Sequence, residues 1–138
     1  NLLILTAGLS AALSHPPATT VSKAEMAAFA WMAQALPADA GVLAAPETGL
    51  MLPGYTGLHV LYGHPFESYG GDEMLGAVEA AYRSGDLSLL SAQPGIEYVY
   101  VGPHEKALCG GQCEFGTGDY LQTLFMNEGI TIYRVTNE

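Results

Sequence analysis

Two apolar runs of the chain each end in a segment that holds a histidine and a glutamate. The first segment, GHPFE, contains His64 and Glu67, and the second, GPHEK, contains His104 and Glu105. Imidazole and carboxylate groups are those that general acid–base catalysis and hydrolytic metal centres use. These four side chains could therefore serve one active site, provided that the fold brings the two segments together.

The elements that must position these residues alternate along the chain. Runs dense in β-branched and aromatic residues, such as IEYVYVG, predict strands, and a helix is predicted where Ser22 can act as the N-cap with Glu25 three residues later. We predict helices at 22–36 and 70–85, core strands at 41–46, 58–63 and 96–102, and a hairpin at 120–126 and 130–135. This alternation favours an α/β fold of two or three layers with a parallel core, to which the hairpin adds antiparallel strands.

Ligands of open parallel sheets bind at the carboxyl ends of the strands, near the point where the strand order reverses. AAPETG, GHPFE and GPHEK end the three predicted core strands in turn. We therefore expect a rim that contacts a ligand at this edge, made of Tyr55, His64, Phe66, Glu67, His104 and Glu105.

The same segments also have a purely structural interpretation. Pro65 and Pro103 would give each strand a rigid exit, with His64 hydrogen-bonded to nearby backbone. No HExxH, HxH or DxD pattern fixes a metal geometry, and no GxSxG, GxGxxG or P-loop pattern is present. Because no catalytic set is complete, we predict no catalytic residue, metal ion or cofactor in this chain.

Length and composition limit the organisation and the partners. The chain has 138 residues, which is enough for a single domain over 15–138. Its formal net charge is −10 and its four Lys and Arg residues are scattered, so nucleic acid is not an expected partner. Hydrophobic residues make up 49% of the chain and charged residues 13%, which indicates that part of the surface contacts something other than water.

Residues 1–14, NLLILTAGLSAALS, contain no charged side chain. This run is shorter than the roughly 20 residues that span a bilayer, and it lacks the basic start of a signal peptide. It is either the end of a membrane helix or a helix packed on the domain. We favour the first origin, with the chain a fragment of a longer protein because Asn1 is not an initiator Met, and expect an amphipathic helix in the isolated fragment.

Cys109 and Cys113 are the two cysteines of the chain, in the segment CGGQC. One C-x3-C pair is at most half of a zinc site, and no second pair lies at ligand spacing. In an oxidising compartment the two glycines between them would let the sulfurs meet. We favour a local disulfide, with two free thiols or a metal site as the alternatives.

Trp31 and the segments LPADAGVLAAPETGLMLPGYTGLHVLYGHPFES, YVYVGPHEK and GITIYRV together resemble a known class of sequence. They are similar to the soluble C-terminal region of bacterial multi-spanning membrane proteins of the glycosyltransferase C superfamily, which includes mannosyltransferases and oligosaccharyltransferases and uses lipid-linked sugars. The resemblance covers about residues 15–135. It implies a domain on the extracytoplasmic face of the bacterial membrane, with the catalytic acids upstream, in loops between membrane helices. The WWDYG-like motif of oligosaccharyltransferases is absent.

These observations leave three hypotheses. The first is a non-catalytic extracytoplasmic domain of a membrane glycosyltransferase-like protein, with the rest of its own chain and a lipid-linked sugar or acceptor as partners. The second is a small metal-dependent or acid–base hydrolase that uses His64, Glu67, His104 and Glu105. The third is a structural or interaction module whose apolar start docks a partner.

Overall fold

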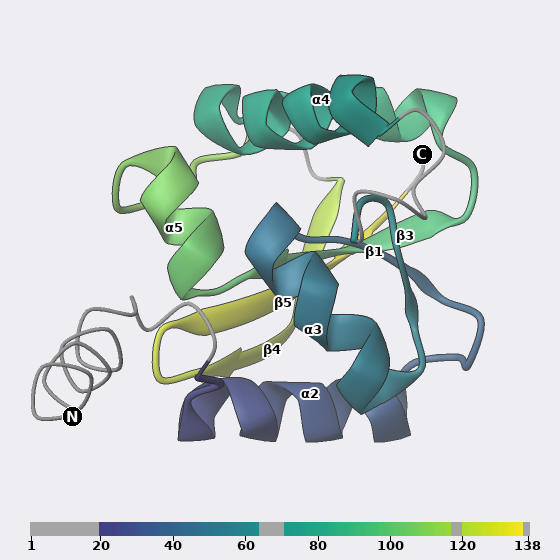
Figure 1. Cartoon of the computed structure of the whole chain (residues 1–138), viewed down its shortest axis with the longest axis vertical. Coiled ribbons are helices and arrows are strands. Elements are labelled where there is room, and N and C mark those ends of the chain that lie inside the picture. Colours follow the sequence, from purple (N-terminus) through teal and green to yellow (C-terminus); the bar gives the residue numbers. More distant parts are fainter. Residues whose placement is uncertain (1–19, 64–70, 117–119, 137–138) are drawn as a thin grey trace, which may run out of the picture.

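The computed structural model describes residues 20–63, 71–116 and 120–136 and confirms the predicted α/β fold (Figure 1). A mixed sheet of five strands lies between two layers of helices. In chain order the elements are α2 (Lys23–Ala35), β1 (Gly41–Leu43), α3 (Pro46–Thr56), β2 (His59–Val60), α4 (Gly71–Ser84), the 3₁₀ helix η2 (Ser88–Ala92), β3 (Ile96–Val101), α5 (Pro103–Cys109), β4 (Leu121–Asn127) and β5 (Ile130–Val135).

The strands lie in the order β2-β1-β3-β5-β4. β1 is parallel to both β2 and β3, whereas β5 is antiparallel to β3 and to β4. The chain thus moves from β1 to one neighbour and then crosses to the other side of β1. The predicted parallel core and the C-terminal antiparallel hairpin are both present.

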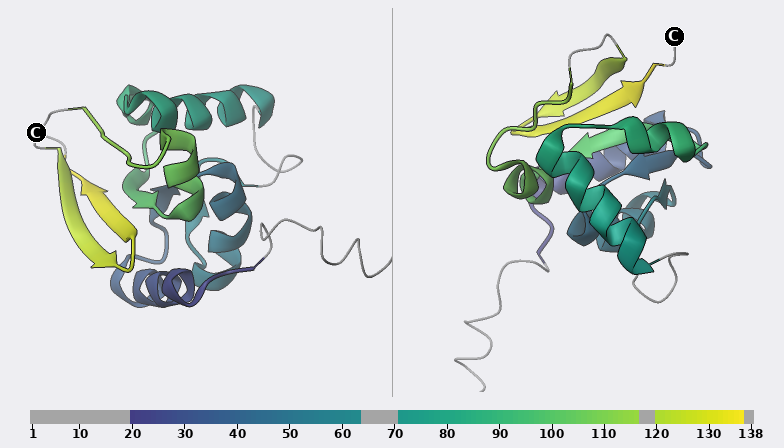
Figure 2. Two further views of the ribbon diagram at one scale, coloured as in Figure 1. Left: turned by 90° about the vertical axis from the view of Figure 1, so that its left-hand side faces the viewer. Right: turned by 90° about the horizontal axis from the view of Figure 1, so that it is seen from above.

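Side chains alternate between the two faces of the sheet, as the pleat requires. Val42 and Tyr100 point to one face, in a core that includes residues of α2 and α3, whereas Leu43 and Val99 point to the other, in a core that includes residues of α4 and α5. Figure 2 shows the hairpin of β4 and β5 extending the sheet past both helical layers. Burial of two separate apolar faces is what holds the three layers together.

Local sequence signals explain where the helices begin and end. Ser22 and Glu25 form a complete capping box at the start of α2, as predicted. Pro46 and Pro103 occupy the first turns of α3 and α5, where a missing N–H costs nothing. Gly57 closes α3 in the left-handed conformation that glycine adopts without strain.

Several boundaries differ from the predicted ones. The first core strand ends at Leu43 because Pro46 starts a helix of eleven residues, α3, which was not among the predicted helices. The second core strand, predicted at 58–63, is reduced to His59–Val60. GPHEK, interpreted as a strand exit, forms the first part of α5. Among the described residues, no helix combines the length and the apolar character that crossing a membrane demands.

We predict that two glycines of α3 respond oppositely to alanine substitution. A Cβ atom at Gly49 would lie 2.1 Å from the carbonyl oxygen of Tyr62, whereas a Cβ atom at Gly54 would meet no atom within 4 Å. Gly49→Ala should therefore lower the free energy of unfolding by about 1–3 kcal/mol, as overpacking does. Gly54→Ala should raise it by about 0.5–1 kcal/mol, because alanine is the better helix former. Urea denaturation of both variants measures this difference, and equal responses would contradict the close packing of α3.

Candidate functional site

The point where the strand order reverses lies between β1 and β3. The chain leaves the carboxyl end of β1 into α3, on one face of the sheet, and leaves the carboxyl end of β3 into α5, on the other face. The first turns of the two helices meet at this edge, close enough for Glu105 of α5 to bond the backbone at the start of α3. In open α/β sheets this is the usual place for a ligand, so it is the candidate site of this fold.

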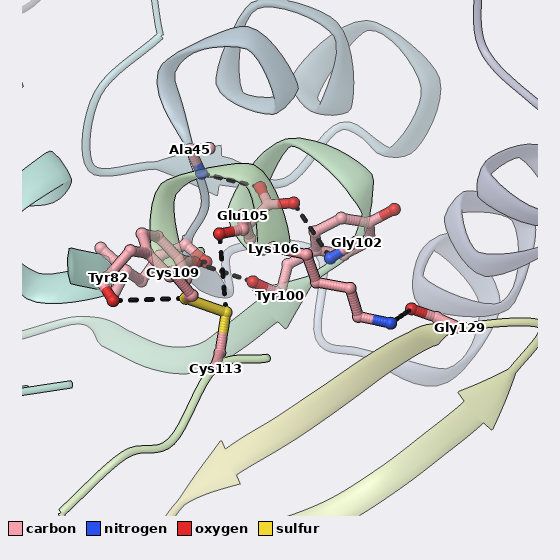
Figure 3. The surroundings of a disulfide bond; sticks show 10 residues. Ala45, Tyr82, Tyr100, Gly102, Glu105, Lys106, Cys109, Cys113 and Gly129 are labelled. Atoms are coloured by element: carbon pink, nitrogen blue, oxygen red, sulfur yellow. Dashed lines mark hydrogen bonds between the residues drawn. A yellow bond between two sulfur atoms is a disulfide. The ribbon is translucent and has the colours of Figure 1, made fainter. Parts of the chain in front are cut away.

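The carboxylate of Glu105 occupies this position (Figure 3). Its Oε1 accepts a hydrogen bond of 2.8 Å from the backbone N–H of Ala45, and its Oε2 accepts one of 3.0 Å from the backbone N–H of Gly102. The Glu105 side chain is fully buried. The protein therefore uses its own carboxylate to satisfy the N–H groups that a bound anion would otherwise meet in such a crevice.

Three other buried polar groups belong to this part of the core. The Oγ1 atom of Thr48, the hydroxyl of Tyr100 and the Oε1 atom of Glu25 make no hydrogen bond of normal geometry. The Tyr100 ring lies against the backbone of Gly102, where a Cβ atom would come within 2.7 Å of it. A side chain at position 102 would therefore displace the Tyr100 ring. The same residue donates its backbone N–H to Glu105.

Tyr82 of α4 ties the same two strands together from the opposite layer. Its hydroxyl lies 2.9 Å from the carbonyl oxygen of Leu43 and 2.7 Å from that of Tyr100, so that one proton is shared between the last residue of β1 and the last but one of β3. The hydroxyl thereby supplies a donor to two carbonyl groups at the carboxyl edge. Tyr82 and Glu105 thus link the same edge, one through carbonyl oxygens and the other through N–H groups.

Burial dominates the protonation of this cluster. It raises the pKa of Glu105 above the ordinary value of 4.5, although the Thr48 hydroxyl and the N–H groups of Ala45 and Gly102 oppose the shift. Burial also raises the pKa of Tyr82 and Tyr100, and the nearby Glu105 carboxylate adds to both shifts. The tyrosines therefore remain protonated donors at neutral pH.

A disulfide joins Cys109 and Cys113 at the C-terminal end of α5. The Cys109 sulfur lies 3.2 Å from the carbonyl oxygen of Tyr82, and the Cys113 sulfur lies 3.5 Å from that of Glu105 (Figure 3). The disulfide therefore closes the end of α5 onto the segment that follows it, and its sulfur atoms lie against carbonyl oxygens of α4 and α5. This is the arrangement that the spacing of CGGQC favours in an oxidising compartment.

The structure describes three residues of the expected rim, which are Tyr55, His104 and Glu105. Tyr55 is 51% exposed on α3, and its ring stacks on Phe29 with centroids 5.7 Å apart. His104 is half-buried in the first turn of α5. Glu105 is not on the rim, because it turns inward to the N–H groups that it bonds. His64, Phe66 and Glu67 lie outside the described residues.

Sequence reasoning missed the buried polar groups near Glu105, which are Thr48, Tyr82 and Tyr100. One signal was available: in Gly102-Pro103-His104-Glu105 a proline and a glutamate follow a possible N-cap at the spacing of a capping box. That pattern predicts a helix start with an inward-turned carboxylate. It does not predict the second bond to Ala45, which lies 60 residues away in the chain.

Two surface hollows lie away from this edge. The larger is an open groove of about 1290 Å³ at the amino end of β3, and its walls include Asp86, Glu97, Tyr120 and Arg134. A smaller one of about 250 Å³ borders Cys109 and Gln112. Within 20–63, 71–116 and 120–136, no three His, Cys, Asp or Glu side chains converge as metal ligands would.

Comparisons with models of protein families, with curated proteins and with solved structures found no significant match to this chain.

We predict that Glu105→Ala lowers the free energy of unfolding by about 2–4 kcal/mol. It leaves the N–H groups of Ala45 and Gly102 without a partner, at about 1–3 kcal/mol each, and the loss of the costly buried carboxylate offsets part of this. Glu97→Gln, on an exposed side chain of β3, is the control and should change stability by less than about 0.5 kcal/mol. Equal stability of the Glu105 variant and the unmodified chain in denaturant titrations would contradict the bridging role.

The raised pKa of Glu105 also predicts a dependence of stability on pH. The folded chain holds the proton of the Glu105 carboxyl group more tightly than the unfolded chain does. The stabilisation that this proton gives is therefore complete below 4.5, the pKa of the group in the unfolded chain, and is lost as pH rises through the pKa in the folded chain. The difference in unfolding free energy between the unmodified chain and Glu105→Gln isolates this group from all others. As pH rises from 4.5 through the folded pKa of Glu105, the unmodified chain should lose stability relative to Glu105→Gln. Above that pKa the difference should stay constant. A difference that moves the other way would mean that the carboxylate is stabilised as an anion.

Proposed function

We propose that this chain is a non-catalytic extracytoplasmic domain of a membrane glycosyltransferase-like protein. In this role it covers the membrane-embedded part of its own longer chain and helps to position a lipid-linked sugar donor or an acceptor. The proposal combines the sequence resemblance with the geometry of the carboxyl edge of the sheet. Each of these supports a different part of it.

The observation that carries the non-catalytic role is the occupation of the switch point by Glu105. A catalytic centre of an open α/β sheet needs free N–H groups or free side chains at this edge. Here the Glu105 carboxylate is buried, and both of its oxygens accept backbone hydrogen bonds. The same contacts count against a hydrolase that would use Glu105 as a general base or a metal ligand, because such a group must reach its substrate or metal.

Two features support the extracytoplasmic location. The disulfide between Cys109 and Cys113 is of a kind that persists in oxidising environments outside the cytoplasm. The charge-free residues 1–14 are suited to the end of a membrane helix. Both features agree with the position of the resembling domains, after the last membrane helix.

The test is sugar transfer from a lipid-linked donor by membranes that contain the longer protein. Removal of residues 15–138 should greatly reduce transfer, since the domain helps to position the reactants. Tyr55→Ala and His104→Ala change side chains of the expected rim and should raise KM several-fold while kcat stays nearly unchanged. The reason is that these side chains would bind the substrate and the transition state equally strongly.

Three outcomes would count against the proposal. Full transfer after deletion of the domain would show that it has no part in the reaction. A large loss of kcat in either rim variant would place catalysis in this domain. A maleimide that labels Cys109 and Cys113 in intact cells before any reductant is added would show free thiols and contradict an oxidising location. The double variant Cys109→Ser/Cys113→Ser gives the background labelling.

A further inference from the structure

The outer face of α2 is apolar over nearly its whole length. This surface, named here the α2 face, consists of the exposed residues Lys23, Met26, Ala27, Ala30, Ala33 and Gln34. The largest apolar side chain of this face, Met26, is 42% exposed. Lys23 is its one charged residue and lies at the start of the helix, since Glu25 points into the core.

The helix on the opposite side of the sheet has the contrary pattern. α4 lies across the sheet from α2 (Figure 1) and carries Asp72, Glu73, Glu79 and Arg83, of which the last two form an ion pair of 2.9 Å. A helix whose outer side meets water normally has such a polar face, whereas a helix that is apolar all round is covered. In a chain with a formal net charge of −10, the α2 face has no acidic side chain.

Aromatic side chains lie along both flanks of the α2 face. On the side of α3, Tyr55 is 51% exposed and stacks on Phe29 of α2. On the side of the hairpin, Trp31 is half-buried and its ring centroid lies 5.1 Å from that of Phe125. Tyrosine and tryptophan are the residues that gather where an apolar medium meets water.

The chain outside the described residues indicates what covers the α2 face. Residues 1–14 have no charge, and only 15–22 separate them from the first residue of α2. An extended chain spans at most about 3.5 Å per residue, so this connection keeps the start of α2 within about 30 Å of the point where the apolar run ends. If that run ends in a bilayer, α2 is the first described element that follows it and lies near the membrane surface.

We propose that the α2 face rests on the lipid surface, with its apolar side chains at the level of the headgroups and Lys23 beside the lipid phosphates. The acidic side chains of α4 then point away from the membrane. This inference rests on the membrane attachment in the proposed function and adds the orientation of the domain. An apolar interfacial helix flanked by aromatic rings binds lipid through buried area, and a cation at its edge adds attraction to phosphate.

The test uses the 138-residue chain with phosphatidylcholine vesicles whose acyl chains are brominated. Trp31 is the only tryptophan of the sequence, so quenching of its fluorescence reports contact of the α2 flank with lipid. Ala30→Glu places a charge in the middle of the α2 face, and Ala80→Glu places the same charge on the exposed side of α4. Both positions are exposed alanines within helices, so neither variant should unfold, and circular dichroism checks this.

We expect the chain to float with the vesicles and its Trp31 fluorescence to be quenched. Ala30→Glu should lose most of the quenching and Ala80→Glu should keep it. Flotation without quenching, or equal quenching in the two variants, would overturn the orientation and leave the membrane attachment in place. A chain that stays in solution would overturn the attachment and the orientation together. A dimer in analytical ultracentrifugation that Ala30→Glu alone dissociates would show that a second copy covers the α2 face instead.

Discussion

The carboxyl edge of the sheet depends on one buried carboxylate with two partners far apart in the chain. Glu105 bonds the N–H of Gly102, three residues before it, and the N–H of Ala45, 60 residues before it. The first bond fixes the start of α5 and the second fixes that start to the first turn of α3. Without this side chain, two buried N–H groups would have no acceptor, and such groups cost more than a single hydrogen bond gains. A glutamate is needed here because it can satisfy both donors at once.

The other contacts of this edge follow from that bridge. Tyr82 reaches through from α4 to the carbonyl oxygens of Leu43 and Tyr100, so the layer opposite α3 is tied to the same strand ends. The disulfide at the end of α5 lies against the backbone of α4 at Tyr82. The crevice in which other sheets of this kind bind their ligands is here a structural joint. Recognition at this edge would depend on side chains outside the joint, of which His104, in the first turn of α5, is described.

Local signals in the sequence were enough to predict the fold class and most of its elements, although the number of layers stayed open between two and three. Alternating apolar runs and capping residues predicted α2, α4, β3 and the hairpin, because these elements depend on their own periodicity. α5 was missed because seven residues are too short for a periodic pattern, although Pro103 and Glu105 mark its start. The bridge from Glu105 to Ala45 could not be predicted, since it depends on which two strand ends become neighbours. For the same reason a glutamate placed on the rim by its sequence position is buried in the structure.

The two helical layers also differ in a way that gives the domain a direction. α4 has the charged outer side of a helix in water, whereas the α2 face does not. Because the sheet lies between them, a membrane under α2 would run roughly along the sheet, with α4 outermost. Tyr55 lies at the boundary of α2 and α3, so this orientation would bring it near the lipid headgroups, where the proposed function would place the sugar of a lipid-linked donor. In that proposal the exposed ring of Tyr55 has a physical reason to be at the surface, because an aromatic face can stack on a sugar as well as on Phe29.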